Sequence, residues 1–167
     1  MKPTPEFRAA TIEAIIAECV RQGLTLKTQQ AYVLATVEHE TAGTWAPVRE
    51  AFWKSESWRR THRPTSRYYP FYGRGYVQLT WRSNYQKYSD IIGVDFTAEP
   101  DLVMEPGVAA FILVHGFVHG TFTTKKISDY INEKECDFIR ARRCINNNDR
   151  ARMIAKLADK HLAALEG

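Results

Sequence analysis

The sequence predicts a mostly α-helical single domain with at most one small β-hairpin. Its 167 residues suit one domain, with 44% hydrophobic and 25% charged residues. Several segments repeat apolar residues at helical spacing, and only 73–80 favours a glycine-punctuated turn with a short extended piece. The length and composition exclude a disordered chain and a disulfide-rich miniprotein. We expect residues 1–167 to form one domain.

The first half of the chain contains two predicted helices and a long irregular segment. Apolar spacing predicts a helix over 12–20 that stops at Gly23. Thr28 is a suitable N-cap for a second helix that runs to about Glu40. Periodicity then fails over 45–70, a segment with three prolines. Irregular segments of this length inside a compact domain are often functional.

Helical patterns return in the second half. Ser83 is a candidate cap for a third helix that closes at Gly93, and Pro106 suits the first turn of a fourth helix over 108–118. That fourth helix is apolar nearly all round, which predicts the central buried helix. We expect short helices over 128–131 and 135–144, and a final amphipathic helix capped by Asp149.

Charge and aromatic residues concentrate in the middle of the chain. The net charge is +4, yet the segment 49–82 holds eight basic and two acidic residues. Twelve of the 20 aromatic residues, including all four tryptophans, lie between Trp45 and Tyr88. This modest basic excess allows an anionic partner without requiring one.

Cellular location follows from weaker signals. The three cysteines (Cys19, Cys136 and Cys144) form a poor disulfide framework, so we expect reduced thiols. No apolar run follows the first residues, so no secretory signal is expected. The longest apolar stretch, 108–118, falls short of the roughly 20 residues that span a bilayer, so we expect no stable membrane insertion.

Four glutamates are the only acidic residues between positions 19 and 89: Glu38, Glu40, Glu50 and Glu56. The dipole at a helix C-terminus favours the protonated form of Glu40, especially if Trp45 or Phe52 desolvates it, and this suits a general acid. Arg49 would favour the ionised form of Glu50, which suits a general base. Two such carboxyls are the minimum for glycoside hydrolysis. The residues alone do not choose among the four, and a solvated helix end is the commoner situation.

Two motifs resemble glycoside hydrolase family 19. The segment 31–41 is similar to the family's helix with a His-Glu-Thr motif, and 73–85 is similar to its second signature. The segment 140–146 resembles the end of the compact bacteriophage members. The resemblance implies an α+β lysozyme-like fold and the activity of an endolysin. It also implies that residues 1–167 form one catalytic domain without a separate wall-binding domain.

The resemblance also implies roles for single residues. Glu40 matches the general acid and Glu50 the second glutamate of the phage members, with Glu56 as a rival base. Thr80 matches a hydroxyl residue that holds the attacking water. Matches to substrate-binding positions are Tyr76, Gln78, Asn84, Arg142 and Asn146. The phage pattern has glycine where this chain has Asn147, which can adopt the same left-handed conformation.

No metal or cofactor is expected. His115 and His119 have a spacing that can hold zinc, but no carboxylate accompanies them, so core or interface positions are expected instead. No dinucleotide-binding loop or thiol-protease context is present.

The expected function is an endolysin of muramidase (lysozyme) type that cleaves β-1,4 bonds of peptidoglycan glycan strands. We expect a monomer that accumulates in the host cytoplasm and reaches the wall after holin-type membrane permeabilisation. One alternative is a chitinase acting on GlcNAc polymers. The other is a non-catalytic module that binds glycan or single-stranded nucleic acid, although nucleic acid is not the expected partner.

Overall fold

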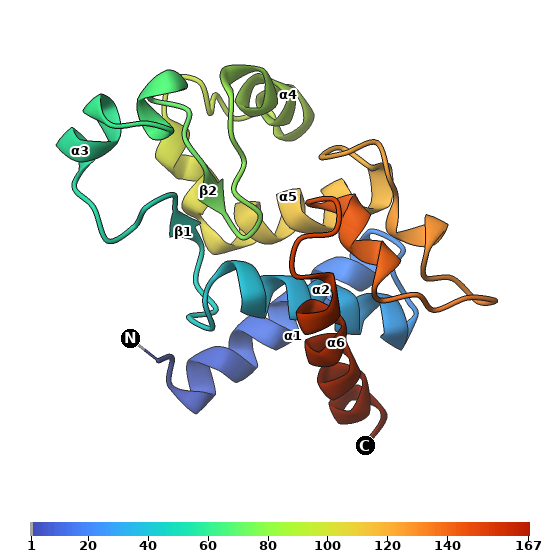
Figure 1. Cartoon of the computed structure of the whole chain (residues 1–167). Coiled ribbons are helices and arrows are strands. Elements are labelled where there is room, and N and C mark those ends of the chain that lie inside the picture. The colour runs from blue at the N-terminus through green and yellow to red at the C-terminus, as the bar shows by residue number, and fades with distance from the viewer. Residues whose placement is uncertain (1) are drawn as a thin grey trace. The chain divides into compact units, whose positions relative to one another are not determined.

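The computed structural model describes residues 2–167 and divides them into two compact units. The first unit contains the chain up to Trp45 and the segment Ala110–Gly167, and the second is Ala46–Ala109. Within residues 2–167 there are six α-helices, four 3₁₀ helices and one two-stranded sheet (Figure 1). The prediction of a mostly helical fold with very little β-structure is confirmed.

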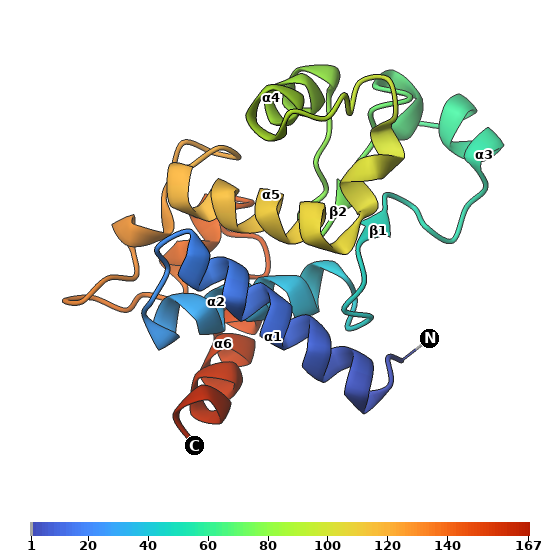
Figure 2. The same cartoon turned by 180° about the vertical axis from the view of Figure 1, so that it is seen from behind.

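The first unit is built around α2 (Lys27–Glu40). This helix packs against α1 (Pro5–Arg21) and α6 (Ala151–Glu166), as both views show (Figures 1 and 2). Nine consecutive α2 residues, Gln29–Val37, are buried. The unit also contains the second part of α5 (Pro106–His119) and two 3₁₀ helices, η3 (Ile127–Asp129) and η4 (Arg140–Cys144). α2 is therefore buried on all sides. The sequence predicted α5 as the central buried helix, and α5 is also largely buried.

The second unit combines short elements. They are β1 (Val48–Arg49), α3 (Glu56–Thr61), η1 (Thr65–Arg67), β2 (Arg74–Gly75), α4 (Arg82–Ile92), η2 (Pro100–Met104) and the first turn of α5. The strands are antiparallel, with Val48 opposite Gly75 and Arg49 opposite Arg74. Five aromatic residues form much of the buried core: Tyr72, Tyr76, Tyr85, Tyr88 and Phe96.

The small sheet differs from the predicted hairpin in its connection. Segment 50–73 joins the two strands, and it contains α3 and η1. Arg74 also forms an isolated antiparallel bridge with Leu79, which gives the expected turn over 73–80. The predicted irregular segment therefore folds around two short helices that a search for long periodicity does not detect.

The glycine and proline signals located two helix ends correctly. Gly93 ends α4 in the left-handed conformation with a φ of 81°, and Pro106 begins α5. No helix in the described part of the chain is long and apolar enough to cross a membrane. All three cysteines have free thiols; Cys136 is exposed and the other two are buried.

Three predicted helix starts are wrong. α2 begins after Leu26, so Thr28 lies inside its first turn, and α4 begins after Trp81, so Ser83 lies inside it. α6 begins after Arg150 rather than after Asp149. None of the three observed N-cap residues makes a side-chain capping bond. Tertiary contacts therefore determine these boundaries, and capping propensity does not.

The predicted short helices are shorter than expected. Segment 128–131 is represented by η3, one residue earlier, and 135–144 is helical only over η4. An antiparallel bridge between Ile131 and Cys136 occupies the segment between them.

Candidate active site

Glu40 is the last residue of α2, and a tight turn follows it. The Thr41 hydroxyl donates to the Val37 carbonyl oxygen at 2.7 Å and accepts from the Trp45 amide at 3.1 Å. Gly43, with a φ of 75°, donates its amide to the Glu38 carbonyl oxygen at 2.8 Å. Because a positive φ favours glycine, the glycine of this motif fixes the turn that ends the helix at Glu40.

The Glu40 carboxylate forms an ion pair with Arg142 of η4. Nη1 of Arg142 lies 2.8 Å from Oε1 of Glu40, and the side chains are 2% and 19% exposed, respectively. Nε of Arg142 donates to the Asp149 carbonyl oxygen at 2.8 Å. The guanidinium is therefore held between the chain before α6 and the proposed acid. Spacing along the chain did not predict Arg142 as the partner of Glu40.

The aromatic residues expected to desolvate Glu40 have other contacts. The buried Trp45 ring packs edge-on against His161 of α6, with centroids 5.6 Å apart, and the Arg8 guanidinium lies over it. Phe52 belongs to the second unit and is 52% exposed.

Asn146 lies just after η4. Its backbone amide donates to the Arg142 carbonyl oxygen at 3.0 Å, and its side chain is exposed. Asn147 has a φ of 41°, so it takes the left-handed conformation that was expected of it. The first unit therefore pairs the side chains of Glu40 and Arg142, whereas Asn146 is bonded to Arg142 through the backbone.

Glu50 follows β1 in the second unit, and both of its carboxylate oxygens accept hydrogen bonds. The Tyr68 hydroxyl donates to Oε1 at 2.7 Å, and the Gly73 amide donates to Oε2 at 3.0 Å. The two bonds together fix the orientation of the Glu50 carboxylate. Burial and the hydrogen bond to Glu50 raise the pKa of Tyr68, so this hydroxyl remains a donor at neutral pH.

The predicted partner of Glu50 is wrong. Arg49 pairs with Asp101 instead, at 3.0 Å. Successive side chains of an extended chain point to opposite sides, so neighbours along a strand are poorly placed to pair with each other.

Arg59 fixes the backbone around Glu50. This arginine is 5% exposed, and its guanidinium donates to the carbonyl oxygens of Glu50, at 2.9 Å, and of Ala51, at 3.1 Å. The same group pairs with Glu56 at 3.1 Å. Neither Arg59 nor Tyr68 was a predicted site residue, and no sequence signal marks either, because their contacts depend on the fold of the 50–73 segment.

Glu56, the rival base, is held mainly by tyrosines and Arg59. The Tyr72 hydroxyl donates to its Oε2 at 2.8 Å. Burial alone would raise the pKa of Glu56, but hydrogen bonds from Tyr72, Tyr69 and Arg59 outweigh burial and lower it. Glu56 therefore remains ionised as part of the structure that anchors Arg59.

The polar residues of the second signature form a connected chain. The Gln78 side-chain amide donates to the Val48 carbonyl oxygen at 3.1 Å, and the Thr80 hydroxyl donates to the Gln78 carbonyl oxygen at 2.8 Å. Asn84 donates to the Thr80 carbonyl oxygen at 2.7 Å. Tyr76 is 3% exposed, and burial raises its pKa to about 12. Tyr76 is therefore a core residue in this unit, whereas Gln78, Thr80 and Asn84 retain partial exposure.

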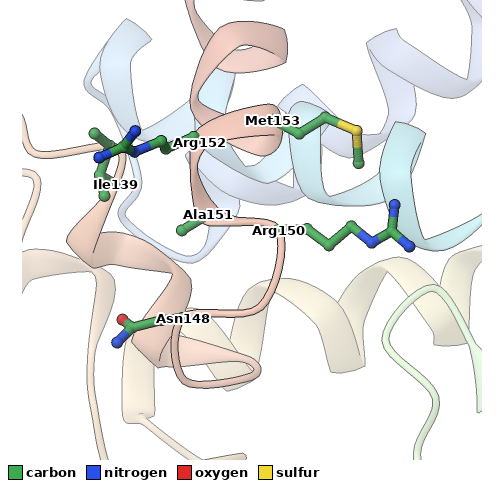
Figure 3. A pocket seen from close by; sticks show the side chains of 6 residues that line it. All are labelled: Ile139, Asn148, Arg150, Ala151, Arg152 and Met153. Carbon is green, nitrogen blue, oxygen red and sulfur yellow. The ribbon is translucent and has the colours of Figure 1, made fainter.

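No metal centre is apparent within residues 2–167, where no three His, Cys, Asp or Glu side chains gather as ligands. The rings of His115 and His119 pack together with centroids 4.3 Å apart. An open hollow of about 380 Å³ lies at the start of α6 and is lined by Ile139, Asn148, Arg150, Ala151, Arg152 and Met153 (Figure 3). The predicted site residues are not among these six.

Comparisons with known proteins agree on one family. A family model described as chitinase class I matches residues 17–130. Chitinase 11 of Oryza sativa subsp. japonica is 36% identical over 87 residues, which are 52% of this chain and 34% of that protein. Basic endochitinase B of Arabidopsis thaliana is 34% identical over 103 residues, covering 52% and 30% of the two chains. The matched region is thus about a third of the length of these relatives.

Solved structures share the fold. Chitinase C from Streptomyces griseus HUT6037 superposes with a TM-score of 0.59 at 20% identity, covering 90% of this chain and 66% of that one. A bacterial family 19 chitinase gives a TM-score of 0.59 at 20% identity, covering 93% and 85%.

Proposed function

Because the chain belongs to the chitinase class I family, glycoside hydrolase family 19, we propose that it is a glycosidase that cleaves β-1,4 bonds in a glycan by acid/base catalysis. The observation that carries the proposal is the Glu40 carboxylate at the end of α2, held at 2.8 Å by the buried Arg142. A buried guanidinium that holds one oxygen of a partly exposed carboxyl fixes the orientation of the other oxygen.

The proposed general acid is Glu40. Arg142 takes its Oε1, so we assign the proton that is transferred to the glycosidic oxygen to Oε2. As the general acid, Glu40 gives this proton to the glycosidic oxygen as the bond to the anomeric carbon breaks.

The proposed general base is Glu50. Hydrogen bonds from Tyr68 and Gly73 orient the carboxylate, so that it can accept a proton from water. The Thr80 hydroxyl has its hydrogen committed to the Gln78 carbonyl oxygen, so its lone pairs are available to accept from that water. Attack by this water in a single displacement would invert the anomeric carbon.

The proposed substrate is the glycan strand of peptidoglycan, cleaved at muramyl bonds by a phage-type endolysin. The basic segment 49–82 supports an approach to an anionic wall, an attraction that salt should weaken. We propose that the protein acts as a monomer and reaches the wall from the host cytoplasm once the membrane is permeabilised. The second candidate is chitin, favoured by the names of the plant and bacterial relatives.

The test compares three substrates under the same conditions: purified peptidoglycan, chitin oligomers and a single-stranded oligonucleotide. New reducing ends from peptidoglycan support the endolysin, and release from chitin oligomers alone supports the chitinase. Oligonucleotide binding without either activity contradicts the glycosidase proposal. Mass spectrometry of the muropeptides identifies the sugar at the new reducing end, and anhydro products would indicate a lyase instead.

A further inference from the structure

Two aromatic side chains project into solvent directly after Glu50. Phe52 is 52% exposed, and Trp53, at 70%, is the most exposed large hydrophobic residue among those described. Their rings pack edge-to-face, with centroids 5.2 Å apart and an interplanar angle of 83°. Exposing apolar surface of this kind to water costs free energy, and a ligand that covers the two rings offsets this cost.

The turn that carries these rings is anchored. Ala51 has a φ of 49°, and its carbonyl oxygen accepts from the Lys54 amide at 2.8 Å and from the buried Arg59 guanidinium at 3.1 Å. Arg59 also holds the Glu50 carbonyl oxygen. One buried cation therefore fixes both the backbone of the proposed base and the start of the aromatic turn.

The surroundings of the pair favour a neutral ring as the ligand over a phosphate chain. The Lys54 ammonium lies over the Trp58 ring, 5.4 Å from its centroid, and Arg59 is buried and paired with Glu56. Arg49 is paired with Asp101, so the three cations closest to the pair along the chain are already engaged by groups of the protein. What the turn offers is two exposed aromatic rings that pack edge-to-face.

We propose that Phe52 and Trp53 form a stacking subsite for one pyranose ring of the glycan strand, next to the base Glu50. This inference rests on the proposed function and deepens it. The C–H faces of a pyranose are apolar while its hydroxyl edges remain solvated, so a sugar ring covers an exposed aromatic face without burying unpaired polar groups. A subsite of this kind contributes to the grip on a long strand and takes no part in bond cleavage.

The experiment measures binding to insoluble peptidoglycan and the KM and kcat of its cleavage for wild type, Trp53→Ala, Phe52→Ala and Trp53→Tyr. Phe7→Ala, which removes a 45% exposed ring from α1, is the matched control. Trp53→Ala should weaken binding and raise KM about tenfold with little change in kcat, given the usual strength of aromatic stacking. Trp53→Tyr should restore most of the loss, and Phe7→Ala should match wild type.

Several outcomes would overturn the subsite. If the wild type cleaves the wall and the Trp53→Ala variant binds and cleaves it equally well, the subsite is refuted and the proposed function is unaffected. Selective loss of oligonucleotide binding, or conversion of a dimer to a monomer, would show that the pair serves another partner. A wild type that releases no reducing ends would refute the glycosidase, whereas Trp53-dependent binding to peptidoglycan would still support the stacking site.

Discussion

The guanidinium of Arg142 lies 2.8 Å from the Glu40 carboxylate, although 102 positions separate the two residues in the sequence. The pair joins the C-terminal end of α2 to η4. Arg142 is 2% exposed, so it is shielded from solvent and salt.

Replacing Arg142 with alanine should destabilise the protein and impair catalysis. The change leaves Glu40 and the Asp149 carbonyl oxygen without this donor, and breaking a buried pair costs about 3 kcal/mol. Urea unfolding should show this loss, and Arg143→Ala, an exposed neighbour, is the control. An Arg142→Ala variant as stable as the Arg143→Ala control would show that the pair contributes nothing.

Replacing Tyr68 with phenylalanine should lower kcat about tenfold, because it removes a hydrogen bond to the charged Glu50. The ring contact between Tyr68 and Trp81 should remain. Tyr72→Phe is the comparison, because the Tyr72 hydroxyl donates to Glu56. If Tyr72→Phe reduced kcat while Tyr68→Phe did not, Glu56 would replace Glu50 as the base.

Replacing Arg59 with lysine should reduce both stability and activity. An ammonium cannot reproduce the planar fork that reaches two carbonyl oxygens and Glu56 together. We expect a lower unfolding midpoint and at least about a tenfold lower kcat/KM. The exposed neighbour variant Arg60→Lys should behave like wild type; equal effects of the two changes would refute a positioning role for Arg59.

Stability should fall as the pH falls from about 6.5, the ordinary pKa of histidine. Burial lowers the pKa of His161 in the fold, outweighing the opposing influence of Glu38, which accepts from its Nε2 at 2.7 Å. Below about 6.5 the unfolded chain thus binds more protons than the folded one, and the stability present above that pH is lost. Glu38, Arg8 and Trp45 are the groups that face His161.

The measurement is the free energy of unfolding between pH 5 and 7.5 for wild type and His161→Gln. Glutamine can still donate to Glu38, so its slope with pH should be flatter. A residual slope is expected, because burial also lowers the pKa of His39. Identical slopes for the two proteins would contradict the assignment to His161.

Sequence reasoning predicted the features that depend on local chemistry. Gly93 and Pro106 marked helix ends because their backbone preferences act within one turn. The start of α6 was missed, because the Asp149 carbonyl oxygen is bound by Arg142 and the helix begins one residue later.

At the candidate site, sequence reasoning likewise identified single residues but not the contacts that depend on the fold. The motifs identified Glu40, Glu50 and Thr80 as candidates, but the partners of Glu50 are Tyr68 and Gly73, 18 and 23 positions away. Spacing along the chain favoured Arg49, whose side chain is paired with Asp101. Folding of the 50–73 segment creates these contacts, and no periodic pattern encodes them.

The most direct test of the proposed function is the rate of reducing-end formation from purified peptidoglycan by wild type, Glu40→Gln and Glu13→Gln. The amide can still accept from Arg142 but has no proton to transfer, and Glu13 is an exposed residue of α1. We predict full activity for Glu13→Gln and a folded Glu40→Gln protein without activity. A folded Glu40→Gln variant that releases reducing ends at the wild-type rate would contradict the role of Glu40 as the general acid.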